Sequence, residues 1–288
     1  MTTRAATLGS LAMAATALLW SIAGLFIKMI DWHPLTIAGF RSLLASFVIL
    51  LCLKRPHIHL SFPQAAAAVA NTATMLLFVA ANKTTTSANA IILQYIAPVS
   101  TAFIGALLLK ERTRREHWIA IVVVTGGIIV MFLDQLGGGR MLGNIFALLS
   151  GIAFSFYLVF MRMQKDGSPL ESILLAHWLT AGIGIGATVV LGFPTVTLKS
   201  AAAVAVLGFV QIGIPAILIT AAIKRISAVS ANLIAVIEPV FNPVWVFLAL
   251  GEAPGLNAVI GGVVILSAVA GASVISARSI AFLERKDP

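Results

Sequence analysis

The chain has 288 residues, of which 60% are hydrophobic and only 10% are charged, and its mean hydropathy is +1.04. Ordinary soluble domains are about 25% charged, so this composition excludes them and predicts a helical membrane protein. The net charge of +9 does not indicate nucleic-acid binding, because the basic residues lie in short connectors and not on a folded polar surface. Cys52 is the only cysteine, which excludes a disulfide framework and a thiolate metal site. We expect no metal and no cofactor.

Apolar runs follow one another along the chain, and each is long enough to cross a hydrocarbon core of about 30 Å. The first run is longer than the roughly 7–15 apolar residues of a cleaved signal peptide, so we expect it to be retained. The connectors are too short to hold a catalytic domain. The sequence therefore predicts an all-α membrane protein with ten transmembrane helices. The expected spans are about 8–29, 34–53, 63–82, 85–109, 115–133, 142–163, 170–192, 199–222, 227–250 and 255–277.

Basic residues are distributed unequally between the two sides of this topology. Fourteen of the 19 Lys and Arg residues fall on one side, four fall on the other, and Arg41 lies inside the second span. Short loops rich in Lys and Arg stay in the cytoplasm. We therefore expect a multi-pass protein of the cell (inner) membrane with both termini in the cytoplasm.

The two halves of the sequence match each other. Residues 83–111 align with residues 224–252 without a gap, at an offset of 141 residues. Each half, residues 1–136 and residues 137–288, holds five expected spans, and this odd number makes the second half enter the membrane in the opposite orientation. The sequence therefore predicts two inverted five-helix repeats. Inverted repeats are typical of secondary transporters, whose substrate site lies near the bilayer midplane.

The first spans of the two halves also match, at an offset of 134 residues. Gly9 aligns with Gly143, and Ser21 aligns with Ser155. The connector after the fourth span, residues 110–115, is strongly basic, whereas its counterpart in the second half contains no Lys or Arg. This difference in charge is what a reversed orientation of the second half requires.

Prolines interrupt three of the expected spans. A proline removes an intrahelical hydrogen bond and clashes with the preceding turn, which a membrane tolerates only where neighbouring groups or water satisfy the freed carbonyls. Pro98 and Pro239 occupy matching positions in the two halves, which favours gating kinks over passive packing. Pro215 interrupts the eighth span and has no counterpart in the third.

Each half carries a proline, ten or so further apolar residues and then a glutamate. The motifs are Ala97-Pro98 with Lys110-Glu111, and Glu238-Pro239 with Gly251-Glu252, to which Phe40-Arg41 is added in the second span. With these motifs, essentially the whole chain resembles the EamA branch of the drug/metabolite transporter superfamily. The resemblance implies a ten-helix basket that exports small organic molecules by alternating access. Within the branch, the chain is most similar overall to YddG-type exporters of aromatic amino acids.

Two charged residues, Arg41 and Glu238, lie deep inside the expected spans. Glu238 is the one acidic residue deep in a span, where an ionisable group costs about 2.5–3.5 kcal/mol. It could bind a substrate amino group or exchange a proton, but we favour a structural role with a partner such as Arg41 or the backbone near Pro239. Arg41 could bind a substrate carboxylate, although we favour snorkelling to the interface. His177 stands at the repeat-related position, and we expect it to be a hydrogen-bonded interior residue.

Planar and polar side chains at mid-membrane depth predict a pocket suited to an aromatic ring and a zwitterion. For any single ring, helix packing or lipid contact is the alternative, and the amides could instead bond across helices. Trp245 and Phe247 belong to the same aromatic group, and Asn71 is a further amide at this depth. The candidate substrate-binding residues are Trp20, Met75, Phe78, Gln94, Tyr95, Phe154, Tyr157, Gln211, Asn232, Glu238 and Asn242.

We expect an exporter of small amphiphilic metabolites, secondary active or facilitative, that works as a monomer in the lipid bilayer. The leading substrates are Phe, Tyr and Trp. Other amino acids, purine-like metabolites and cationic drugs are the alternative substrates. An intramembrane enzyme is a distant alternative, because the four Asp residues lie in connectors or the tail and cannot form an aspartyl pair, and no His/Cys cluster could bind zinc.

Overall fold

The computed structural model describes residues 3–85, 87–111, 113–133, 140–250 and 255–286, in which all regular structure is helical. Eight helical stretches in this part of the chain are long and apolar enough to cross a membrane. The chain is therefore a multi-pass membrane protein. The eight stretches are Thr3–Ile27, Pro34–Leu53, Phe62–Thr84, Asn89–Leu108, Met141–Met163, Pro169–Leu191, Leu198–Ile223 and Leu256–Ser276.

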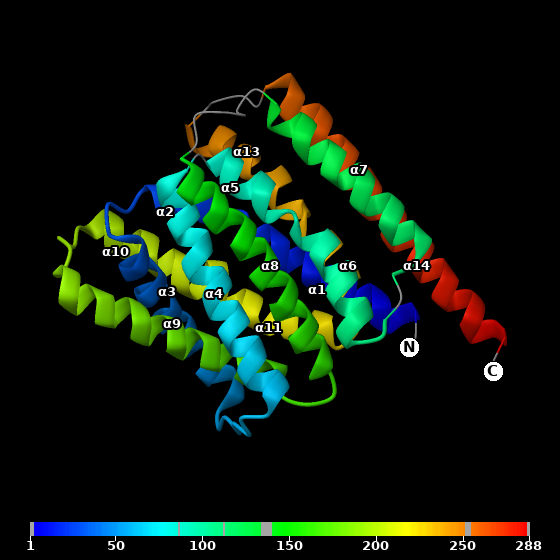
Figure 1. The fold of residues 1–288 in the computed structure, drawn as a ribbon, viewed down its shortest axis with the longest axis horizontal. Helices are drawn as coiled ribbons and strands as arrows, with labels where there is room; N and C mark the ends of the chain where they lie inside the picture. The colour runs from blue at the N-terminus through cyan, green and yellow to red at the C-terminus, as the bar shows by residue number, and fades with distance from the viewer. Residues whose placement is uncertain (1–2, 86, 112, 134–139, 251–254, 287–288) are drawn as a thin grey trace.

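The helical elements follow one another through short connections (Figure 1). In chain order they are α1 (Thr3–Trp20), α2 (Ala23–Lys28), α3 (Pro34–Leu53), α4 (Phe62–Thr84), α5 (Ser87–Gln94), α6 (Ala97–Leu108), α7 (Arg115–Met131), α8 (Met141–Met163), α9 (Pro169–Leu191), α10 (Leu198–Ala205), the π-helical segment η2 (Val206–Gly213), α11 (Ile214–Ile223), α12 (Ala228–Ala235), α13 (Ile237–Leu250) and α14 (Leu256–Lys286).

Local sequence fixes several of the helix starts. Pro34 and Pro169 open α3 and α9, where a missing N–H costs nothing because the first amides of a helix have no intrahelical partner. The Ser61 side chain accepts a hydrogen bond from the backbone N–H of Gln64 at the start of α4. Thr197 forms a capping box at the start of α10. These residues determine where the helices begin and therefore where the short connectors before them end.

Several of the long apolar stretches are interrupted. α1 and α2 are separated at Ser21 and Ile22, α5 and α6 at Tyr95 and Ile96, and α12 and α13 at Val236. A fourth stretch continues from α10 to α11 through η2. Unlike the other three, it is locally widened and not broken, since a π-helix is wound more loosely than an α-helix.

Prolines account for three of these four irregularities. Pro98 and Pro239 lie one turn or less after the breaks at Ile96 and Val236, and Pro215 directly follows η2 and Ile214. The interruptions expected from the sequence at these prolines are present in the structure. The break between α1 and α2 has no proline, and here the Ser21 hydroxyl donates to the Leu18 carbonyl at 2.6 Å.

The helices pack as an interlocked bundle. α4 packs against α8 and α9, α3 packs against α9 and η2, and α1 packs against α11. α7 and α14 lie side by side along one edge of the bundle (Figure 1). A methyl group added to Gly127 of α7 would lie 3.2 Å from the Gly261 carbonyl oxygen of α14. The small residues expected at close helix contacts in membranes are thus found at this crossing.

The structure corrects some of the expected spans. α14 runs to Lys286, beyond the expected end at 277, because the segment that carries Arg278, Glu284, Arg285 and Lys286 continues the helix. α7 has only 17 residues, and α12–α13 is interrupted, so neither is among the eight long stretches. Trp20 is the last residue of α1 and lies at the break before α2, within the stretch Thr3–Ile27.

Candidate substrate-binding site

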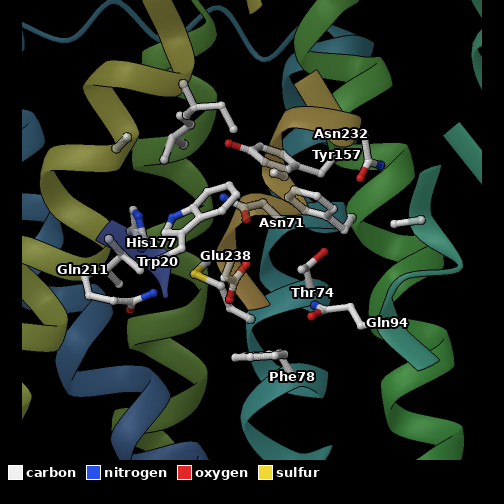
Figure 2. Close-up of a pocket in the computed structure, with 18 of the residues that line it drawn as sticks. Trp20, Asn71, Thr74, Phe78, Gln94, Tyr157, His177, Gln211, Asn232 and Glu238 are labelled. Atoms are coloured by element: carbon white, nitrogen blue, oxygen red, sulfur yellow. The ribbon is translucent and has the colours of Figure 1, made fainter. Parts of the chain in front are cut away.

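A cavity of about 110 Å³ lies inside the bundle, where the interrupted stretches meet α3, α4, α8 and α9 (Figure 2). An enclosed water molecule needs roughly 10–15 Å³ of such space, so the cavity has room for several waters. Ten of the eleven candidate substrate-binding side chains line it, and the side chain of Asn242 lies outside the described residues. The ten are Trp20, Met75, Phe78, Gln94, Tyr95, Phe154, Tyr157, Gln211, Asn232 and Glu238.

One wall of the cavity is aromatic. Trp20 and Phe154 form an edge-to-face pair with ring centroids 5.7 Å apart and an interplanar angle of 72°. Phe154 is also 6.0 Å from Tyr157, whose ring is buried against the core. Trp20 and Phe154 occupy matching positions in the two halves of the sequence, 134 residues apart. Edge-to-face pairs of this kind leave flat faces on which a further planar group can stack.

A second wall comes from one face of α4. Asn71, Thr74, Met75 and Phe78 line the cavity with the spacing i, i+3, i+4, i+7, which places side chains on one side of a helix. The candidate set contained Met75 and Phe78, and Asn71 was expected only as a further amide at this depth, whereas Thr74 was not expected. The helical spacing of the other three residues is the signal that would have found Thr74.

The elbow between α5 and α6 is held by hydrogen bonds from α8. The Gln94 amide donates to the Ser150 hydroxyl at 3.0 Å, and Ser150 donates to the Thr74 carbonyl at 3.2 Å. Ser155 donates to the Ala97 carbonyl at 2.9 Å. These bonds supply the polar partners that an interrupted helix needs inside a membrane. They also fix Gln94 with its side chain in the cavity wall.

Asn232 presents an unmatched acceptor at the cavity. Its side-chain nitrogen donates to the Thr101 hydroxyl at 2.6 Å, while its side-chain oxygen is buried without a hydrogen-bond partner. Buried polar atoms are nearly always paired in folded proteins. Asn232 therefore offers a ligand one acceptor whose orientation the protein has already fixed.

Arg41, Gln211 and His177 form a polar cluster on the side of the cavity near Trp20, where Figure 2 shows Gln211 and His177. Arg41 Nη1 lies 3.5 Å from the Gln211 side-chain oxygen. Arg41 Nε and His177 Nδ1 are buried and have no partner. Arg41 is only 2% exposed, so its side chain does not snorkel to the interface. The hydrogen-bond partner expected for His177 is likewise missing at Nδ1.

Glu238 lies near the centre of the cavity view in Figure 2. It interacts with the Tyr95 hydroxyl, which also lies 3.5 Å from the Ala235 carbonyl oxygen. Arg41, the partner named for Glu238 from the sequence, is not in ion-pair contact with it. The ion pairs among the described residues are Arg114–Glu116 and Arg162–Glu111.

The prolines and the remaining aromatic residues lie outside the cavity lining. Pro98, Pro239 and Pro215 are each the immediate neighbour of a lining residue, respectively Ala97, Glu238 and Ala216. In the aromatic group, the Trp245 indole donates to the Ser21 hydroxyl at 2.6 Å, and Phe247 is 46% exposed. Neither ring is part of the wall of this cavity, in line with the packing or lipid contact given above as the alternative.

The model of the EamA-like transporter family matches residues 7–133 and, separately, residues 141–274. The chain belongs to the EamA-like transporter family. An "Uncharacterized transporter" from Archaeoglobus fulgidus is 24% identical over 265 residues, which cover 91% of this chain and 94% of that protein. Another, from Clostridium kluyveri, is 27% identical over 172 residues. That alignment covers 55% of this chain and 54% of the relative, so the chain matches about half of its length.

The fold of this EamA-like transporter is also found among solved structures. One crystal structure matches it with a TM-score of 0.79 and 21% sequence identity, over 94% of this chain and 98% of that one. At this identity the likeness shows a shared fold and nothing about the transported molecule. The residues that line the cavity are what indicates the chemistry of the substrate.

Proposed function

We propose that this EamA-like transporter exports small amphiphilic metabolites by alternating access through the cavity, and that aromatic amino acids are its leading substrates. One observation carries the proposal. The cavity has the Trp20–Phe154–Tyr157 wall on one side and fixed polar groups, such as Gln94 and Asn232, on another. An aromatic side chain matches the first surface and a zwitterionic backbone matches the second.

Matching contacts between the halves support two inverted repeats, residues 1–136 and 137–288, with ten spans in total. A methyl group added to Gly143 would lie 2.7 Å from Thr84 Oγ1, and one added to Gly9 would lie 2.7 Å from Arg225 Cβ. The two glycines are 134 positions apart, and their two neighbours are 141 apart. These are the offsets of the two sequence matches. The packing of α4 on α8 has its counterpart in α11 on α1.

This symmetry gives the paired helix breaks a role. In inverted-repeat transporters, interrupted helices flank the substrate site and one repeat moves against the other. We assign Pro98 and Pro239 to the kinks that permit this movement, and Pro215 to a third flexible point next to η2. The residues that adjoin them, Ala97 and Glu238 among them, line the cavity, so movement at the kinks would change the cavity directly.

Transport by purified protein in liposomes tests the substrate proposal. Counterflow of labelled Phe, Tyr and Trp is compared with that of leucine, lysine, adenine and a lipophilic cation, which represent the alternative substrates. We expect the aromatic amino acids to be exchanged fastest. Phe154→Ala should raise the half-saturating Phe concentration about tenfold, because the substrate ring loses one stacking partner and the area buried against it.

Phe156→Ala is the matched control for Phe154→Ala. Phe156 is two residues away in α8 and stacks on Phe160 with centroids 5.9 Å apart, outside the cavity lining. The Phe156→Ala substitution removes a phenyl ring from α8, as Phe154→Ala does. Absence of Phe, Tyr and Trp counterflow, with exchange of another compound, would replace aromatic amino acids by that compound. If the two substitutions raised the half-saturating Phe concentration equally, the aromatic wall would not be a binding surface for the substrate.

We further propose that the protein is a monomer of the cell (inner) membrane with both termini in the cytoplasm. The distribution of basic residues supports this orientation, and Figure 1 shows the start of α1 and the end of α14 on the same side of the view. A reporter fused to the C-terminus, active only in the cytoplasm, measures it. Activity only outside the cell would contradict the orientation.

A further inference from the structure

We propose that Arg41 is the anion-binding residue of the cavity and that the transported molecule carries a carboxylate, which binds the Arg41 guanidinium beside Gln211 and His177. The proposal names the substrate class of the site assigned above and therefore rests on the proposed function. It is independent of whether the rest of the substrate is aromatic. The position of Arg41, its lack of close partners and its chemistry support this role.

Arg41 is deep in the protein and turned inward. It is the eighth residue of α3, which places its Cα about 10 Å along the helix from Pro34 at 1.5 Å per residue. A long basic side chain at that depth can reach the membrane interface by extending along the helix. Arg41 instead lines the cavity and is 2% exposed. The protein thus directs a permanent positive charge toward the space where a ligand would lie.

The donors of this guanidinium are largely unmatched. A guanidinium carries five N–H donors, and the nearest polar partner of Arg41 in the described part of the chain is the Gln211 side-chain oxygen, 3.5 Å from Nη1. That distance is beyond the usual range for an N–H···O hydrogen bond. Arg41 Nε is buried with no partner. Neither ion pair in the described part of the chain involves Arg41, and Glu238 interacts with Tyr95 instead.

A carboxylate fits these open positions better than other groups. Its two coplanar oxygens match the fork of N–H groups on a guanidinium, and the pair forms charge-assisted hydrogen bonds. A neutral ligand would leave the charge without a counterion. A phosphate would bring up to two negative charges, yet Arg41 is the one Lys or Arg among the described residues of the cavity.

The neighbours of Arg41 place the rest of the ligand. His177 Nδ1 is a second buried nitrogen without a partner at this end of the cavity. Figure 2 shows His177 and Gln211 next to Trp20, and Trp20 is paired with Phe154. A carboxylate on Arg41 therefore leaves the attached side chain close to the aromatic wall. Apolar compounds without a carboxylate lack the group that holds them in this orientation.

The experiment compares acids with their matched neutral and cationic analogues in liposome counterflow. The aromatic set is phenylalanine, phenylalaninamide, phenethylamine and 3-phenylpropionate, and the aliphatic set is leucine and leucinamide. The main variant is Gln211→Glu, which places a built-in carboxylate next to the Arg41 guanidinium. We expect it to reduce the preference for acid over amide at least about tenfold, as loss of one charge-assisted hydrogen bond would, while amide transport persists.

Two further variants separate binding from folding. Arg41→Lys keeps the charge but loses the planar fork, and we expect an intermediate acid preference. Gln94→Glu puts the same carboxylate in the same cavity on the side where Figure 2 shows Gln94, away from Gln211. Gln94→Glu should lower the thermal unfolding temperature because its charge has no cationic neighbour, whereas Gln211→Glu should not.

The outcomes distinguish this proposal from the proposed function. If the wild type exchanges phenethylamine as fast as phenylalanine, or if Gln211→Glu keeps the full acid preference, Arg41 is not the carboxylate site, although aromatic transport stands. If leucine is exchanged in preference to leucinamide while no aromatic compound moves, the aromatic substrate is wrong and the carboxylate site stands. A loss of acid preference in Gln211→Glu with unchanged stability supports the proposal.

Discussion

Gly151 of α8 is the position where a single added methyl group should disturb the substrate cavity most. It faces the elbow between α5 and α6, where Pro98 frees the Gln94 carbonyl from helical hydrogen bonding. A Cβ at Gly151 would overlap the Gln94 carbonyl oxygen and lie 2.8 Å from Ile96 Cγ2. We therefore expect Gly151→Ala to separate α8 from this elbow.

The size of the effect follows from the geometry. Ordinary contact of a Cβ begins at 3.4 Å, so Ile96 would have to move by at least 0.6 Å, and the Gln94 backbone by more. Overpacking of this kind costs about 1–3 kcal/mol. Alanine is favoured over glycine in a helix by up to about 1 kcal/mol, which offsets part of that cost. We expect a net loss of about 1–2 kcal/mol, with Gln94 displaced from the cavity wall.

The assay is reversible unfolding of the purified protein in mixed micelles, together with counterflow in liposomes. Gly182→Ala is the matched control, because Gly182 is also a helical glycine, in α9, and a Cβ there meets nothing within 4 Å. Gly182→Ala should leave stability unchanged or slightly raised. If Gly151→Ala is as stable and as active as Gly182→Ala, the close approach of α8 to the elbow does not hold the cavity together.

Two other substitutions test polar contacts described above. Glu238→Gln keeps an acceptor for the Tyr95 hydroxyl, so we expect efflux with an unchanged pH dependence; if the variant loses a pH dependence that the wild type shows, Glu238 carries a proton. Arg162→Gln removes both the 3.1 Å ion pair with Glu111 and the 2.8 Å hydrogen bond to the Ile223 carbonyl. We expect it to lower the free energy of unfolding by about 1–3 kcal/mol, measured in mixed micelles, and an unchanged value would mean that water replaces these contacts.

The sequence predicted the helical class, most span limits and the interruptions near Pro98 and Pro239. These features depend on local properties, namely apolar run length and the backbone chemistry of proline, so they can be recognised without tertiary information. Ten of the proposed binding residues also line one cavity. Eight of these ten are aromatic or amide side chains at mid-span, and Glu238 is ionisable; a polar group at this depth needs a reason to be present.

Other features depend on contacts between distant segments and had no local signal. The break at Ser21 has no proline and is associated with an indole donor, Trp245, more than 200 positions away. Arg41 points inward beside Gln211, a residue of η2 that lies 170 positions away in the sequence. Pro215 predicted an interruption of the eighth span, but the π-helical form that this interruption takes in η2 could not be predicted from an apolar run.

The pairing of α7 with α14 has a consequence for how the bundle can move. No described residue of either helix belongs to the cavity lining, and the two are in close contact at Gly127 and Gly261. A conformational cycle that opens the cavity to one side and then the other therefore does not require them to separate. α7 and α14 can stay paired at the edge of the bundle through such a cycle, while the helices that line the cavity move.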